Sequence, residues 1–276
     1  MVLERLRLDG KVAVVTGAGR GLGQQMALAL AEAGADVVCA ARTAAQIEST
    51  AEAVRALGRR AIAVPTDVRS PAACEALVQA ALDEFKSIDV MLSNAGIGDA
   101  RGMNMELWDL SDDDWRDAID VNLSSAFYCA RAASKTMVEL GKPGVIINVA
   151  SGTALRAYTQ NIGYGAAKAG VIAMTKTLAQ MLQRYGIRVN CIIPGFVAQQ
   201  PPATPELAQM MQSRGRYIPA GRIGEAWELG PLAVYLASDA SSYVTGQGFI
   251  IDGGGLAGGL APVVFAPSTE EQGTRN

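Results

Sequence analysis

The chain of 276 residues contains no histidine. This absence excludes Ser-His-Asp and Cys-His nucleophiles, histidine-ligated metal sites and a histidine general base. Proton transfer by this protein must therefore use tyrosine, lysine, serine, cysteine or a carboxylate.

Cysteine is scarce as well, and long apolar runs are missing. The four cysteines are widely spaced and form no Cys-x-x-Cys pair, so we expect reduced core thiols. No run of uncharged apolar residues is long enough to span a membrane, and residues 1–11 alternate charged and apolar side chains, unlike a signal peptide. The net charge of −3 disfavours nucleic acid and anionic membranes as partners. We therefore expect a cytoplasmic protein.

Half of the residues are apolar, and short β-branched runs alternate with segments of helical period. Strands that are apolar throughout are buried on both faces, as in a parallel sheet covered by helices on both sides. The sequence predicts a single Rossmann-type, doubly wound α/β domain with a seven-stranded, mostly parallel sheet over residues 1–255. The predicted strands are 12–16, 36–41, 61–65, 90–93, 145–149, 188–193 and 248–251. The predicted helices are 21–33, 43–57, one beginning at Ser70-Pro71, 111–140, 164–185 and 225–237.

Two segments depart from this alternation. Residues 196–222 are rich in proline and are expected to form an irregular insertion near the substrate. Residues 256–276 are expected to form a C-terminal extension that is partly disordered or packs near the site or at a subunit interface.

A glycine-rich turn separates the first predicted strand from the first helix. Its pattern is G-x-x-x-G-x-G, where G-x-G-x-x-G is the usual dinucleotide fingerprint. Glycines let the backbone approach a pyrophosphate, and the free N–H groups at a helix start attract the anion. A tight turn without a ligand is the alternative. The candidate contacts are Gly17, Gly19, Arg20, Gly21, Leu22 and Gly23.

Tyr164 and Lys168 are four residues apart in a predicted helix, so their side chains share one face. An ammonium group near a phenol favours the phenolate, which is a general base. Action near pH 7 requires the pKa of the phenol to fall by about three units. The alternative is a pair of side chains on a solvated helix face.

With the glycine turn, the Tyr164 and Lys168 pair and seven predicted strands, residues 8–254 resemble the short-chain dehydrogenase/reductase family. Other motifs of that family follow in order. They are Asp67-Val68, Ser93-Asn94-Ala95-Gly96, Asn122, Ser151 thirteen residues before Tyr164, Pro194-Gly195, Thr245-Gly246-Gln247 and Asp252-Gly253-Gly254.

The resemblance implies direct hydride transfer between a nicotinamide and the carbon of a carbonyl or secondary alcohol, which requires no metal. It implies that Tyr164 exchanges the proton and Lys168 also holds the nicotinamide ribose. Ser151 hydrogen-bonds the substrate oxygen, and Asn122 positions a water in the proton relay. A strand-end cap at Ser151 and a buried hydrogen bond at Asn122 are the alternatives. The other implied cofactor contacts are Asp67, Val68, Asn94, Ala95, Gly96, Pro194, Gly195 and Val197, while Gln199 stands where the family often has threonine.

The end of the second strand bears on the choice of nicotinamide cofactor. Ala41 takes the place where NAD-preferring members carry aspartate, and Arg42 follows it. Arg20 approaches the same region from the glycine turn. Arginine suits the 2′-phosphate of NADP, so we expect NADP(H) in preference to NAD(H).

These observations predict an NADPH-dependent ketoreductase, such as a 3-oxoacyl or small-ketone reductase. An NAD-dependent alcohol, sugar or steroid dehydrogenase is the alternative within the family. A non-catalytic dinucleotide sensor would not need the Ser151, Tyr164 and Lys168 set, and a Rossmann-type methyltransferase would leave its spacing unexplained.

Enoyl reductases of the family place lysine seven residues after tyrosine, but Asn161 stands seven before Lys168, which disfavours that branch. The family's usual assembly implies a homotetramer. Apolar side chains in the variable segments suggest an apolar substrate; these are Met103, Leu155, Phe196, Met210 and Met211.

Overall fold

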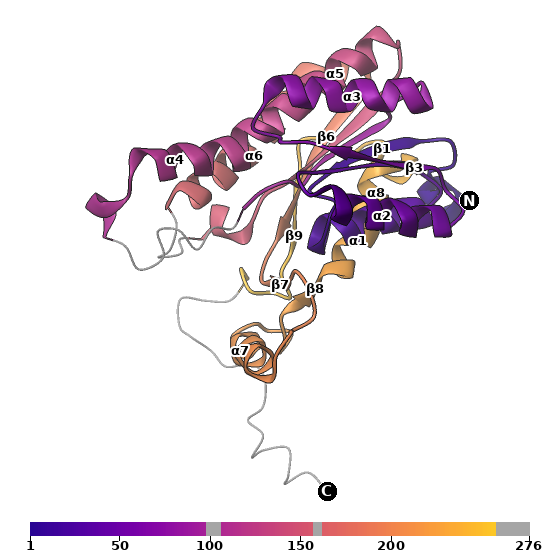
Figure 1. The fold of residues 1–276 in the computed structure, drawn as a ribbon. Coiled ribbons are helices and arrows are strands. Elements are labelled where there is room, and N and C mark those ends of the chain that lie inside the picture. Colours follow the sequence, from indigo (N-terminus) through magenta and orange to yellow (C-terminus); the bar gives the residue numbers. More distant parts are fainter. Residues whose placement is uncertain (98–105, 157–161, 258–276) are drawn as a thin grey trace, which may run out of the picture.

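The computed structural model describes residues 1–97, 106–156 and 162–257. A parallel sheet of seven strands, in the order β3-β2-β1-β4-β5-β6-β9, runs through its centre (Figure 1). The strands are β1 (Val12–Thr16), β2 (Asp36–Ala41), β3 (Ala61–Pro65), β4 (Val90–Ser93), β5 (Gly144–Val149), β6 (Ile187–Pro194) and β9 (Gly248–Ile251). The order changes direction between β1 and β4, where doubly wound sheets bind ligands at the carboxyl ends of their strands. The predicted fold class is confirmed.

Helices cover both faces of the sheet (Figure 1). One face carries α1 (Gly21–Glu32), α2 (Ala44–Ala56) and α8 (Gly230–Ala237). The other carries α3 (Pro71–Phe85), α5 (Ser125–Glu139) and α6 (Ile162–Leu182). This double cover explains why the strands are apolar at every position.

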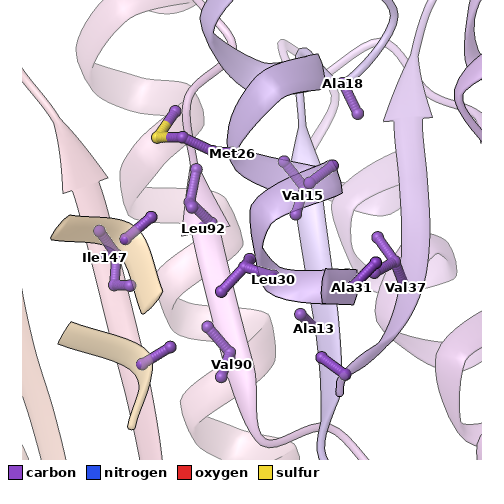
Figure 2. Packing of buried hydrophobic residues seen from close by; sticks show 14 of the residues in the cluster. Ala13, Val15, Ala18, Met26, Leu30, Ala31, Val37, Val90, Leu92 and Ile147 are labelled. Atoms are coloured by element: carbon purple, nitrogen blue, oxygen red, sulfur yellow. The ribbon is translucent and has the colours of Figure 1, made fainter. Parts of the chain in front are cut away.

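Alternate residues of one strand enter opposite cores. Ala13 and Val15 of β1 pack in the core under α1, whereas Val14 packs in the core under α3 and α5. Figure 2 shows Met26 and Leu30 of α1 over the strands, next to the sheet's core side chains. Each fully buried side chain of this size stabilises the fold by about 1.5–3 kcal/mol.

The predicted helix at Ser70-Pro71 is confirmed. Ser70 caps it by accepting a hydrogen bond from the Ala73 N–H at 3.2 Å, and Pro71 is its first residue. All four cysteines are buried free thiols, as expected. None of the helices within the three described segments combines the length and hydropathy needed to cross a bilayer.

The prediction of one helix over residues 111–140 is wrong. Ser111 caps α4 (Asp112–Ile119) as expected, accepting from the Asp114 N–H at 3.1 Å, but a π-helical turn over Asp120–Ser124 then separates α4 from α5. This turn places Asn122 at 2% exposure, where its amide donates to the carbonyl of Ala118. Single π turns inside helices are frequent at functional sites. The apolar period does not reveal them, because they depend on contacts outside the helix.

The prediction that residues 196–222 are irregular is also wrong. They include α7 (Pro205–Gly215), which Thr204 caps by accepting from the Leu207 N–H at 3.3 Å. A short strand, β7 (Val197–Ala198), pairs in parallel with β8 (Gly224–Glu225). The Thr204-Pro205 pair is a helix-start signal that the sequence already contained.

Two further helices differ from their predicted bounds, one at its end and one at its start. The helix predicted to reach residue 185 ends at Leu182 and continues as a 3-10 turn, Gln183–Tyr185. The helix predicted from residue 225 begins as the 3-10 turn Ala226–Leu229 before α8. The expectations for Met103, for Asn161 and for residues 258–276 of the extension lie outside the described residues.

Candidate active site

The glycine turn joins β1 to α1 at the switch point of the sheet. Gly17 has φ +67°, and a Cβ there would lie 2.7 Å from Asn94 Nδ2. A Cβ at Gly23 would collide with the carbonyl oxygen of Gly17. Strand, helix start and the segment after β4 are therefore packed too closely for side chains, and the backbone itself lines the crevice.

Thr16 ties the ends of β1 and β4 together. Its Oγ1 accepts hydrogen bonds from the N–H groups of Asn94 and Ala95, both at 3.1 Å, and the Asn94 amide donates to the Thr16 carbonyl at 3.2 Å. Sequence reasoning did not include Thr16 in the site. Its signal was a hydroxyl at the last position of an otherwise apolar strand.

The start of α1 fits the pyrophosphate of a dinucleotide. The N-cap residue Arg20 makes no side-chain cap to the first turn, so the side chain of Arg20 does not occupy its N–H groups. Gln199 Oε1 lies 3.4 Å from the Leu22 nitrogen, and a Cβ at Gly21 would clash with the same amide. Gln199, which was given no role from the sequence, therefore contacts the glycine turn. This contact crosses 177 residues of chain, so local sequence could not indicate it. Gly19 packs against Gln46 of α2.

Arg20 and Arg42 are the two arginines predicted to bind the 2′-phosphate; Arg20 is the N-cap of α1 and Arg42 follows β2. Both are exposed, and neither has a carboxylate within ion-pair distance among the described residues. Asp67 is instead paired with Arg69, whose hydrogen bond is the main reason why the pKa of that carboxyl lies below its usual value. Val68 beside it is buried. A cavity of about 660 Å³ opens here. It is lined by Arg42, Arg69, Ile97, Asp113, Asp114, Asp117 and Asp120.

Ser151 and Tyr164 meet at the carboxyl edge of β5. Ser151 begins a 3-10 turn, where its Oγ accepts from the Thr153 N–H at 3.3 Å and the Thr153 hydroxyl at 3.0 Å. Because Ser151 accepts twice, its own proton is left to donate. Its hydrogen bond with Tyr164 lowers the pKa of the phenol, although burial has the larger effect and raises it. Thr153, which orients Ser151, was also missing from the predicted site.

Lys168 lies beside the Tyr164 ring, with Nζ 5.7 Å from the ring centroid. Lys168 is 4% exposed, and its ammonium donates to the Val149 carbonyl at 2.9 Å. Burial lowers the pKa of Lys168 to about 8. The depressed pKa expected for Tyr164 is therefore not a property of the protein alone, because burial raises that pKa in the absence of a further positive charge.

Asn122 holds the segment that follows β4. Its Oδ1 accepts from the Ile97 N–H at 3.1 Å, and its amide donates to the Ile97 carbonyl at 3.2 Å. Gly96 lies between two candidate catalytic groups, because a Cβ there would be 2.7 Å from Asn122 Oδ1 and 3.2 Å from Lys168 Nζ. The structure thus brings Asn122 and Lys168 to one point, and the amide makes the buried hydrogen bonds of the alternative interpretation.

Pro194 ends β6 and Gly195 follows it, next to the turn that begins at Ser151. A Cβ at Gly152 would lie 3.5 Å from the Pro194 carbonyl oxygen, and the Gly195 N–H donates to Ile251 of β9 at 2.9 Å. Val197 begins β7, which leads the chain toward α7.

A doubly wound sheet with a glycine turn at its switch point and Ser151, Tyr164 and Lys168 at its carboxyl edge defines a dinucleotide-dependent oxidoreductase. The family model described as enoyl-(acyl carrier protein) reductase matches residues 17–255. The 2-dehydro-3-deoxy-D-gluconate 5-dehydrogenase of Escherichia coli (strain K12) is 39% identical, over 93% of this chain and 100% of its own length. A 3-oxoacyl-[acyl-carrier-protein] reductase of Synechocystis sp. is 38% identical, over 90% of this chain and 97% of its own.

Solved structures agree with this result. A putative short-chain alcohol dehydrogenase from Sinorhizobium meliloti 1021 superposes with a TM-score of 0.85 at 37% identity, covering 92% of this chain and 99% of its own. A gluconate 5-dehydrogenase from Burkholderia cenocepacia J2315 in complex with NADP and tartrate has a TM-score of 0.83 at 33% identity, with coverage of 94% and 100%. A 7α-hydroxysteroid dehydrogenase complexed with NADH has a TM-score of 0.82 at 32% identity, with coverage of 91% and 96%.

The chain belongs to the short-chain dehydrogenase/reductase family. It is an NAD(P)-dependent oxidoreductase that acts on CH–OH groups and interconverts a carbonyl and an alcohol.

Proposed function

We propose that this protein reduces a ketone to a secondary alcohol with NADPH. The observation that carries the proposal is the meeting of Ser151, Tyr164 and Lys168 at the mouth of a backbone-lined crevice. The site residues named from the sequence keep their proposed roles, and Gln199, Thr16 and Thr153 join them as supporting residues.

The residues of the chain divide the chemistry between them. When bound, the nicotinamide supplies the hydride that reaches the carbonyl carbon. Tyr164 gives its phenolic proton to the carbonyl oxygen, and Ser151 donates a hydrogen bond to that oxygen as negative charge develops. Lys168, held by Val149, binds the nicotinamide ribose beside Tyr164 and stabilises the phenolate. Asn122 Oδ1 has a second lone pair that can accept from a relay water.

Tyr164→Phe tests the mechanism. The assay is NADPH oxidation with 3-oxoacyl thioesters, keto acids of sugars and apolar ketones, and NADP reduction with the matching alcohols. We expect kcat to fall by about 100-fold or more, because general acid–base catalysis contributes that much. Tyr243→Phe is the matched control, since Tyr243 is fully exposed. Turnover that survives in Tyr164→Phe contradicts the mechanism, and tight dinucleotide binding without turnover of any compound favours a sensor.

The preference for NADPH rests on Arg42 and Arg20, which are exposed and unpaired within the described chain. We expect Arg42→Ala to raise the Kd for NADPH by about tenfold and to leave the Kd for NADH unchanged, because a charge-assisted phosphate contact is lost. Arg5→Ala, at another exposed arginine, is the control. Fluorescence titration measures both constants. Tighter binding of NADH than of NADPH by the wild-type protein contradicts the assignment.

Two features support further parts of the proposal. Lys168 follows Tyr164 by four residues, which favours a ketoreductase over an enoyl reductase. The C-terminal extension begins beside the site, because Leu256 Cδ1 would lie 3.6 Å from a Cβ at Gly152, and Asp252 fixes the Leu256 N–H at 2.6 Å. Leu256 and Phe196 thus favour an apolar group on the substrate.

A homotetramer is part of the same proposal. Phe127 on α5 and Met181 on α6 are exposed apolar side chains on the long helices expected to form the interface, and β9 is an edge strand. Light scattering coupled to size-exclusion chromatography tests it, and a monomer contradicts it. We also propose a cytoplasmic location, which the four free thiols support.

A further inference from the structure

Arg69 occupies both oxygens of the Asp67 carboxylate. Its Nε lies 3.0 Å from Oδ1 and 3.1 Å from Oδ2, its Nη2 lies 2.6 Å from Oδ2, and its backbone N–H donates to Oδ1 at 3.1 Å. Such a planar fork matches a carboxylate closely. Both oxygens of the Asp67 carboxylate therefore already accept from one arginine.

Arg42 is the other arginine near Asp67. It lines the same cavity as Arg69, and its charge also contributes to the lowered pKa of Asp67, after the larger effect of Arg69. Nevertheless Arg42 is exposed and pairs with no carboxylate in the described part of the chain. Arg42 therefore has no carboxylate partner among these residues, although its charge acts on the nearby Asp67 carboxylate.

The carboxylates that line the cavity also have donors. Asp113 accepts from Arg116 at 3.1 Å, Asp114 from Ser111 at 2.6 Å and Asp120 from Ser124 at 3.2 Å. Asp117 accepts from the second arm of Arg69, Nη1, at 3.2 Å. Without Arg69, Asp67 and Asp117 would both lose this donor, and Asp67 is the carboxylate on which the charge of Arg42 already acts.

We propose that Arg69 determines cofactor specificity by keeping Arg42 available for the 2′-phosphate. Arg69 is a positioning residue that acts through Asp67. In its absence Asp67 captures Arg42, and the phosphate loses its partner and gains a neighbouring negative charge. This inference rests on the proposed binding of NADP(H) at Arg42.

Arg69→Met tests it by fluorescence titration with NADPH and with NADH. The side chain of Arg69 is 44% exposed, so we expect the variant to fold. The Kd for NADPH is expected to rise about tenfold and the Kd for NADH to change less than about twofold, because only the phosphate contact is lost. An equal change in both constants, or no change, overturns the proposal.

The double variant Arg69→Met/Asp67→Asn separates capture of Arg42 from direct phosphate binding by Arg69. It removes the competing anion and restores the local net charge, so the ratio of the two Kd values is expected to return to that of the wild type. A ratio that stays at the Arg69→Met value means that Arg69 itself binds the phosphate, which overturns the proposal. If Arg69→Met does not fold, Arg69→Lys, which keeps the charge but loses the fork, is expected to shift the ratio in the same direction.

Asp117→Asn is the matched control, because it breaks the other arm of Arg69 and leaves Asp67 bound. The ratio of Kd values is expected to stay at the wild-type value. A shift equal to that of Arg69→Met would mean that Arg69 acts by holding α4, and would overturn the proposal. The wild-type ratio tests the proposed cofactor, whereas the change in that ratio on mutation tests Arg69, so the two failures are distinguishable.

Discussion

Lys168→Met should give the protein a different dependence of stability on pH. Lys168 is 4% exposed, and its Nζ has one described hydrogen-bond acceptor, the Val149 carbonyl at 2.9 Å. Burial disfavours the ammonium form and lowers the pKa of the side chain from 10.5 to about 8. In the protein without cofactor, the folded state therefore carries an electrostatic cost that methionine, a side chain of similar length, does not.

The pKa shift sets the size and the pH range of that cost. At about 1.36 kcal/mol per unit, a change from 10.5 to about 8 corresponds to about 3 kcal/mol. Below pH 8 the lysine is charged in both folded and unfolded chains, so the whole cost is present. Between pH 8 and 10.5 the folded chain loses the proton while the unfolded chain keeps it, and the cost is relieved. Loss of the hydrogen bond to Val149 subtracts about 1–3 kcal/mol from the variant at every pH.

The assay is urea unfolding of the cofactor-free wild-type and variant proteins at equal concentration from pH 7 to 10.5. The unfolding free energy of the wild type, minus that of Lys168→Met, should rise by about 3 kcal/mol over this range. Lys176→Met, at an exposed lysine of the same helix, should give a constant difference. A constant difference for Lys168→Met would refute the reasoning, since it would show that burial does not shift this lysine.

The other predictions concern the two threonines of the site. Thr153→Val should lower kcat by about tenfold without raising the Kd of the cofactor, because Ser151 loses a donor that orients it. Thr153→Ser keeps the hydroxyl and should retain activity. Equal steady-state rates for the Thr153→Val and Thr153→Ser variants would contradict this role. Thr16→Val should lower the free energy of unfolding by about 2 kcal/mol, because the N–H groups of Asn94 and Ala95 lose their acceptor; urea unfolding measures the loss, and a stability equal to that of Thr16→Ser would count against it.

The strands were predicted with little error from the sequence. β1 and β4 have the predicted bounds, Val12–Thr16 and Val90–Ser93. Short β-branched runs that are apolar throughout have few alternatives in a chain of this size, because a double-sided core must cover them. The parallel order followed from the alternation with helices.

Helix interruptions were not predictable in the same way. The π turn at Asn122 depends on hydrogen bonds to Ile97, which lies 25 residues earlier. An apolar period reports which side of a helix is buried, and it contains no information on an inserted residue. In contrast, α7 was not predicted, although Thr204 and Pro205 are a typical N-cap and first residue of a helix.

Some features of the candidate site were also predictable from local sequence, and others were not. The spacing of Ser151, Tyr164 and Lys168 and the glycine turn indicated the reaction class, which the comparisons confirm. Gln199 at Leu22 and Thr153 at Ser151 were visible only after folding, as was the rise in the pKa of Tyr164 on burial.

The sequence by itself determined the fold class, the glycine-lined crevice and the chemical types of the reacting side chains. Each of these follows from a local pattern: apolar strand segments, the glycine turn, and the spacing of Ser151, Tyr164 and Lys168. The tertiary structure decided which donors remain free and which are already paired. Arg69 pairs with Asp67 and leaves Arg42 without a carboxylate partner in the described part of the chain, and Lys168 is buried beside Tyr164 with a lowered pKa. The pairing of Arg69 with Asp67, two residues apart, depends on the backbone conformation that folding imposes. The burial of Lys168 against Val149 depends on segments far apart in the chain, and only the folded molecule brings them together.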